Sequence, residues 1–214
     1  MDIKICGLKT EEAVRAAIDG GATHAGFIFF AKSPRHVDVK TAARLAALAS
    51  AAHVQSVAVT VDADDATLDE IVRVMKPDML QLHGKESPER VAAVKARHGL
   101  PVIKALAISQ VQDFARIAPY KGVADRFLFD AKPPKGSDLP GGNAVSFDWA
   151  LLKGLEPGLD YLLAGGIHAG NVAEAIGIAH PPGLDISSGV ESAPGVKDKG
   201  LIAAFLKAAR SART

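Results

Sequence analysis

The fold class is indicated by two short stretches late in the chain, residues 161–166 (YLLAGG) and 184–189 (LDISSG). Each is an apolar run that ends in small residues, as Ala164-Gly165-Gly166 in the first stretch and Ser187-Ser188-Gly189 in the second. Glycine exposes backbone N–H groups, and a serine hydroxyl adds a further donor for an anion. A tight turn alone would also account for the two glycines. Because the turns come as a pair, they predict a phosphate site for a phosphorylated small molecule.

Similar apolar runs recur toward the N-terminus, as is typical of strands buried on both faces of a parallel sheet. The expected strands are residues 3–6, 24–30, 56–61, 79–83, 102–107, 126–130, 161–164 and 184–187. Stretches of helical period lie between them, at residues 10–20, 38–52, 66–76, 87–98, 109–118, 148–152, 169–179 and 198–212. Several of these open with Asp or Ser, which favour the first turn of a helix. The long segment 131–147, rich in Gly and Pro, follows the sixth run, and a loop of that length tends to be functional.

Alternating strands and helices fit both an open doubly wound sheet and a closed barrel. An open sheet usually carries a glycine fingerprint after its first strand, whereas here Gly7-Leu8-Lys9 follows that strand. Glycine turns after the seventh and eighth strands favour a barrel instead. We therefore predict an α/β protein with a single (β/α)8 (TIM) barrel domain over residues 1–214.

Composition excludes several classes of function. With 25 basic and 24 acidic residues the formal charge is +1, so no general electrostatic attraction for nucleic acid is expected. We find no ~20-residue apolar run and no secretory leader, which argues against a membrane protein and for a cytoplasmic one. The single cysteine excludes an internal disulfide and a cysteine-based metal cluster. Monomer and homodimer are both left open.

Chemistry in a barrel is assembled at the carboxyl ends of the strands, where this chain is unusually polar. The residues at these ends, with one arginine from the loop after the second strand, are Cys6, Arg35, Asp62, His83, Asp130, Gly165, Gly166, Ser187 and Ser188. Each also has a structural interpretation. Cys6 fits a small buried apolar residue, Asp130 a turn cap before two prolines, and His83 a core histidine.

Five short motifs distributed along the chain carry a resemblance to a known family. They are Lys4-Ile5-Cys6-Gly7, Gly26-Phe27 with Ser33-Pro34-Arg35, Gln81-Leu82-His83-Gly84, Phe147-Asp148-Trp149 and Ser187-Ser188-Gly189-Val190-Glu191. In this combination the chain resembles phosphoribosylanthranilate isomerase of tryptophan biosynthesis, over essentially its whole length.

The resemblance implies an aldose-ketose isomerisation without a cofactor or metal, the Amadori rearrangement of N-(5-phosphoribosyl)anthranilate to 1-(2-carboxyphenylamino)-1-deoxyribulose 5-phosphate. It implies that Cys6 is the general base and Asp130 the general acid. Arg35 resembles the residue that pairs with the anthranilate carboxylate. The turns at Gly165-Gly166 and Ser187-Ser188-Gly189 resemble the phosphate site, and His83 resembles a pocket-lining residue without an assigned chemical role.

The chain departs from the family pattern in two places. Ala164 stands where many members have a serine, so one hydroxyl donor to phosphate is missing. The segment Leu139-Pro140-Gly141-Gly142-Asn143-Ala144-Val145 replaces a shorter glycine-rich segment with a basic residue. Substrate contacts from residues 131–147 therefore do not follow from the resemblance.

Lys4 lies two residues before Cys6 and so on the same face of the first strand, roughly 6 to 7 Å away. Nearby positive charge favours a thiolate, so Lys4 is a candidate for activating Cys6. Pairing of Lys4 with a carboxylate such as Asp185 is the structural alternative.

Three other functions remain open at this point. Indole-glycerol-phosphate synthase and a histidine-pathway isomerase share the two phosphate turns, but the latter uses aspartates at its first and fifth strands, where this chain has Cys6 and Lys104-Ala105. A non-catalytic phosphosugar-binding barrel would keep the glycine turns without needing Cys6 and Asp130.

Overall fold

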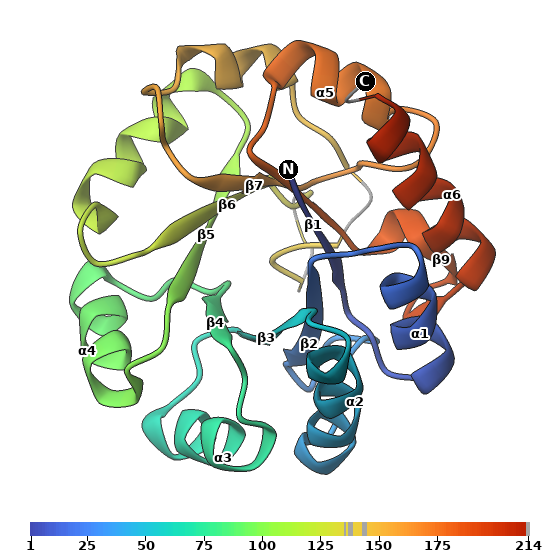
Figure 1. Ribbon diagram of the computed structural model, residues 1–214. Helices are drawn as coiled ribbons and strands as arrows, with labels where there is room; N and C mark the ends of the chain where they lie inside the picture. The colour runs from blue at the N-terminus through green and yellow to red at the C-terminus, as the bar shows by residue number, and fades with distance from the viewer. Residues whose placement is uncertain (135, 137–138, 143–144, 213–214) are drawn as a thin grey trace.

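The carboxyl ends of the strands meet at one mouth of a closed barrel in the computed structural model of the protein (Figure 1). The structure describes residues 1–134, 136, 139–142 and 145–212. Within these residues, eight parallel strands close in sequence order, and their ends fall within one residue of those predicted. The barrel strands are β1 (Asp2–Cys6), β2 (His24–Phe29), β3 (Gln55–Thr60), β4 (Met79–Leu82), β5 (Val102–Ile108), β6 (Arg126–Ala131), β7 (Tyr161–Leu163) and β8 (Gly183–Ile186).

Helices surround the strands on the outside of the barrel (Figure 1). The α-helices are α1 (Glu11–Asp19), α2 (Val39–Ala51), α3 (Asp65–Met75), α4 (Pro88–His98), α5 (Val172–Ala179) and α6 (Lys199–Ser211). Helices α1 to α4 and helix α6 each begin after a Thr, Asp or Ser residue. The side chain of that residue accepts a hydrogen bond from a backbone N–H of the first turn. No helix in the described part of the chain has the length and hydropathy that crossing a bilayer needs.

The fifth and sixth helical positions hold 3-10 helices, η1 (Val111–Tyr120) and η2 (Trp149–Gly154), instead of regular α-helices. In η1 the Asp113 carboxylate accepts hydrogen bonds from the backbone N–H groups of Ser109 and Gln110, and Pro119 lacks the N–H that a continued α-helix needs. The predicted start at residue 109 was therefore two residues too early.

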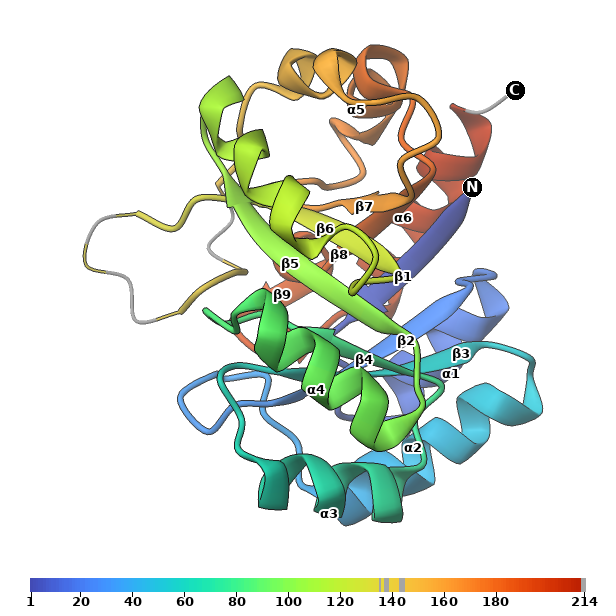
Figure 2. The same ribbon diagram turned by 90° about the vertical axis from the view of Figure 1, so that its left-hand side faces the viewer.

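The connection after β8 contains a short 3-10 turn, η3 (Ser188–Val190), and a two-stranded antiparallel hairpin that the sequence analysis did not anticipate. Its strands are β9 (Glu191–Ala193) and β10 (Val196–Lys197). Figure 2 views the barrel from the side, and both the hairpin and the connection after β6 lie at the carboxyl ends of the strands. The N-terminus and the end of α6 lie on the opposite side.

Closure of the barrel depends on the pairing of β1 with β8, in which Lys4 lies opposite Asp185. Alternate β1 residues face outward, where Ile3 and Ile5 join the large apolar core between strands and helices. The barrel interior holds a second, smaller cluster, so it is packed and is not a channel. That inner cluster consists of Cys6, Val57, Val59, Ile103, Ala105, Leu128, Leu162 and Ala164.

Two lysines are buried in the barrel, and each is paired with its own carboxylate. The Lys4 Nζ lies 2.7 Å from the Asp185 Oδ1, and the Lys104 Nζ lies 2.8 Å from the Glu86 Oε2. Lys104 also donates to the carbonyl oxygens of Leu82 and Gly84, which ties the β4 loop to β5. Burial by itself would raise the pKa of Glu86, but the charge of Lys104 holds it below the ordinary value.

We expect Lys104→Met to destabilise the protein by about 3 to 5 kcal/mol, because it leaves the Glu86 carboxylate buried without a counter-ion. Urea unfolding followed by circular dichroism at neutral pH measures this loss. The double variant Lys104→Met with Glu86→Gln should recover part of the stability, since the buried charge is then gone. Wild-type stability of Lys104→Met would contradict this account of the β4–β5 connection.

Candidate active site

Among the pockets at the carboxyl mouth of the barrel, two adjoining ones hold most of the predicted site residues. The first, here called the turn pocket, is lined by Asp130, Ala131, Gly142, Val145, Ala164, Gly165, Gly166, Ile167, Asp185, Ile186, Ser187 and Ser188. The second, here called the apolar pocket, is lined by Cys6, Ile28, Phe30, Ser33, Arg35, Val59, Val61, Gln81, His83, Asp130, Leu139, Pro140, Gly141, Gly142, Asp185 and Ser187. Asp130, Gly142, Asp185 and Ser187 border both pockets. The predicted site residues thus come together at one mouth.

The turns after β7 and β8 lie side by side, as the sequence predicted. A Cβ on Gly189 would come within 2.1 Å of the Ile167 carbonyl oxygen, so the two turns are in direct contact there. Gly165 and Gly166 have φ angles of +83° and +63°, which favour glycine. A side chain at Gly166 would also collide with the backbone of Ser146. The backbone of each turn therefore forms part of the wall of the turn pocket.

Cys6, at the end of β1, belongs to the inner cluster and also forms part of the wall of the apolar pocket. It is only 4% exposed. Burial raises the pKa of the Cys6 thiol, and the charges of Lys4 and Lys197 act in the opposite direction. Lys4 is paired with Asp185, which is the structural alternative given in the sequence analysis, and its charge also acts on the Cys6 thiol. Its effect on the thiol is weaker than that of burial.

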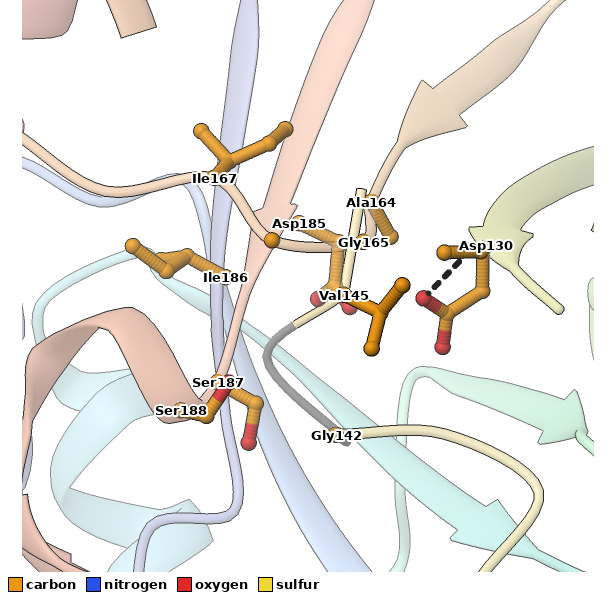
Figure 3. A pocket seen from close by; sticks show the side chains of 12 residues that line it. Asp130, Gly142, Val145, Ala164, Gly165, Ile167, Asp185, Ile186, Ser187 and Ser188 are labelled. Atoms are coloured by element: carbon orange, nitrogen blue, oxygen red, sulfur yellow. Dashed lines mark hydrogen bonds between the residues drawn. The ribbon is translucent and has the colours of Figure 1, made fainter. Parts of the chain in front are cut away.

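Asp130, near the end of β6, lines both pockets, and Figure 3 shows it among the residues of the turn pocket. Its Oδ1 accepts a hydrogen bond of 2.8 Å from the Ala131 N–H, drawn as a dashed line in Figure 3. Its Oδ2 lies 3.5 Å from the Nε2 of His83. The other ring nitrogen of His83 contacts the Gln81 side-chain amide at 2.8 Å. His83 therefore lines the pocket, as expected, and also contacts the carboxylate of Asp130.

Arg35, in the loop after β2, is buried at the edge of the apolar pocket. Its Nε and Nη2 donate to the two carboxylate oxygens of Glu191, at 2.7 and 2.9 Å. Its Nη2 also donates to the Gly142 carbonyl oxygen at 3.2 Å. The resemblance implied that Arg35 pairs with a carboxylate of the substrate. In the structure one edge of the guanidinium is already occupied by Glu191.

Glu191 and Lys197 were not predicted as site residues, although Glu191 closes one of the motifs quoted above. Lys197 donates to Glu191 at 2.6 Å and to the Ser187 carbonyl oxygen at 2.9 Å. No local signal marks Lys197 in the sequence, because its partners lie in a turn and a hairpin that only the fold brings together. Asp62, the remaining polar strand end, accepts a hydrogen bond from the Lys85 N–H and lines a third pocket at this mouth, which Phe30, His83 and Asp130 also border.

The described residues of the segment 131–147 contribute to both pockets. Residues 139–142 and Val145 line them. Asn143 and Ala144, part of the departure noted in the sequence, lie outside the described residues. In the described part of the chain no three His, Cys, Asp or Glu side chains gather in a way that fits a metal ion.

Because Cys6 is the single cysteine, alkylation by iodoacetamide reports on its ionisation alone. We expect the midpoint of the alkylation rate against pH to lie above that of a free cysteine, since burial raises the pKa of Cys6. Lys4→Met should move the midpoint further up, while Lys207→Met, at an exposed position, should leave it in place. A midpoint that Lys4→Met leaves unchanged would reject the electrostatic role of Lys4.

The chain is similar to known proteins over nearly its whole length. The model of the family N-(5'-phosphoribosyl)anthranilate (PRA) isomerase matches residues 3–208. An N-(5'-phosphoribosyl)anthranilate isomerase of Mesorhizobium japonicum is 64% identical over 213 residues, which cover 100% of this chain and 97% of the relative.

Solved structures of phosphoribosyl anthranilate isomerases have the same fold as this chain. The crystal structure of phosphoribosyl anthranilate isomerase from Thermotoga maritima has a TM-score of 0.88 at 31% identity, with 99% of each chain covered. A phosphoribosyl anthranilate isomerase in complex with reduced 1-(o-carboxyphenylamino)-1-deoxyribulose 5-phosphate has a TM-score of 0.85 at 29% identity, again with 99% of each chain covered. With the family model spanning nearly its whole length, this chain belongs to the phosphoribosylanthranilate isomerase family.

Proposed function

We propose that Cys6 is the general base and Asp130 the general acid in the isomerisation of N-(5-phosphoribosyl)anthranilate by this enzyme. The observation that carries the proposal is that these two side chains, which are far apart in the sequence, border the same apolar pocket. They come from β1 and β6, so they approach a sugar bound between them from different sides. Stepwise acid and base catalysis needs that arrangement.

The two pockets match the two ends of the substrate. The turn pocket, between the Gly165-Gly166 and Ser187-Ser188-Gly189 turns, suits the phosphate group. The apolar pocket, whose walls include Ile28, Phe30 and Val59, suits the anthranilate ring, with Arg35 at its edge for the carboxylate. The ribose then bridges the residues that border both pockets. Binding at both ends holds it beside Cys6 and Asp130.

The reaction begins with the Asp130 carboxyl as proton donor. Its proton passes to the furanose ring oxygen as the C1–O bond breaks, and the nitrogen lone pair forms a C=N iminium bond. Cys6 then removes the proton from C2, and the electrons of that C–H bond form an enolamine. Transfer of a proton to C1 and loss of the enol proton give the 2-ketone product. Each step moves only protons and bonding electrons, so the reaction needs no cofactor.

Cys6 acts as a base only in its thiolate form. Burial raises the pKa of Cys6 and so opposes that form, while Lys4 and Lys197 favour it. The iminium ion adds a positive charge next to the proton that Cys6 removes, and this both acidifies C2 and attracts a thiolate. His83, in contact with Asp130, is proposed as a substrate-pocket residue that holds the orientation of this carboxyl group.

We expect Cys6→Ser and Asp130→Asn to abolish most turnover while leaving substrate binding largely intact, because each variant removes one proton-transfer group and keeps its size. General acid or base catalysis contributes on the order of 100- to 10,000-fold. Loss of phosphoribosylanthranilate fluorescence measures turnover, and calorimetry with the reduced product analogue measures binding. Turnover near the wild-type rate in either variant would remove that residue from its proposed role.

A further inference from the structure

The hairpin β9–β10 connects the turn pocket to the loop that carries Arg35. Glu191 in β9 and Lys197 in β10 are paired across the hairpin. Gly195, at its tip, packs so tightly on the loop after β2 that a Cβ there would lie 2.4 Å from the Pro34 carbonyl oxygen. A contact this close holds the hairpin against the loop immediately before Arg35.

Glu191 is the charged centre of this connection. Its side chain is only 3% exposed, and its carboxylate receives Arg35 on both oxygens. Lys197 and the Gly195 N–H donate to the same carboxylate, at 2.6 and 3.2 Å. Burial by itself would raise the pKa of Glu191, but the hydrogen bond from Arg35 and the charge of Lys197 keep it below the ordinary value. Glu191 is therefore a fixed anion in the site.

The bidentate contact determines which edge of the guanidinium remains for a ligand. Glu191 occupies the Nε and Nη2 edge of Arg35. The remaining donors belong to Nη1 and to the second N–H of Nη2, which now contacts Gly142 in the wall of the apolar pocket. A planar carboxylate can pair with that Nη1–Nη2 edge in the same parallel manner. Glu191 thereby leaves the Nη1–Nη2 edge of Arg35 for a ligand carboxylate, which would replace the Gly142 carbonyl oxygen as the partner of Nη2.

Lys197 joins this arrangement to the phosphate end. Its Nζ contacts the carbonyl oxygen and the hydroxyl of Ser187, at 2.9 and 3.2 Å, as well as Glu191. Ser187 borders both pockets and donates to the Cys6 carbonyl oxygen at 3.1 Å. A continuous set of polar contacts thus runs from Arg35 through Glu191 and Lys197 to the turn after β8.

We propose that Glu191, held by Lys197, is a positioning residue that selects the edge of Arg35 available to the anthranilate carboxylate and sets its distance from the phosphate site. The inference rests on the role proposed for Arg35 above. It makes Glu191 a determinant of specificity for N-aryl substrates that carry an ortho carboxylate. A residue that only neutralised Arg35 for folding would not discriminate between ligands.

The test compares two ligands, the reduced product analogue and its counterpart that lacks the carboxylate on the aromatic ring. Calorimetry measures the affinity of wild type, Glu191→Gln and Glu191→Asp for both. Glu191→Asp keeps the charge and shortens the side chain, so it remains informative if Glu191→Gln folds poorly. Glu156→Gln is the control, because it removes one carboxylate charge at an exposed position outside the site.

We expect Glu191→Gln and Glu191→Asp to lose affinity on the order of tenfold or more for the carboxylate ligand, and to bind the other ligand nearly as the wild type does. Equal losses for both ligands, or no loss for either, would overturn the inference. The variant Arg35→Met shows whether such a result contradicts only the role of Glu191 or also the role proposed for Arg35. If it binds both ligands as the wild type does, Arg35 itself has no role in carboxylate binding.

Discussion

The site depends on one strand pairing, that of β1 with β8, which closes the barrel. Lys4 and Asp185 are partners in this register and also form a buried ion pair at 2.7 Å. Either charge alone would be costly inside the barrel, so the pair favours the closed register over an open sheet. The same pairing brings the end of β1, with Cys6, beside the turn after β8 that carries Ser187. Closure and assembly of the active site are therefore one event.

Burial has opposite consequences for binding and for catalysis in this pocket. A packed interior strengthens electrostatic interactions with an anionic substrate, but it also raises the pKa of the Cys6 thiol. Buried cations, each paired with a carboxylate, offset part of this rise: Lys4 with Asp185 and Lys197 with Glu191. Because Arg35 shares Glu191, the Arg35–Glu191–Lys197 group keeps a net positive charge. That charge lies where an anionic substrate is proposed to bind.

Much of the barrel could be predicted from the sequence because its strands are buried on both faces and read as apolar runs. The paired turns at Gly165-Gly166 and Ser187-Ser188 were also predictable, since small residues directly after an apolar run indicate a tight turn. The β9–β10 hairpin was not, because it is short and polar and packs on Pro34 and Arg35 in a distant loop. The ion pair between Arg35 and Glu191 could not be predicted either, because 156 residues separate the two in the sequence.

The central claim is that one bound sugar lies between Cys6 and Asp130, and a crystal structure of this protein with the reduced product analogue tests it most directly. We predict the phosphate at the Gly165-Gly166 and Ser187-Ser188 turns. The Cys6 sulfur should lie roughly 3 to 3.5 Å from C2, with the Asp130 carboxyl within hydrogen-bond reach of the former ring oxygen. An analogue bound with its phosphate elsewhere, or with Cys6 screened from the sugar by other side chains, would contradict the account.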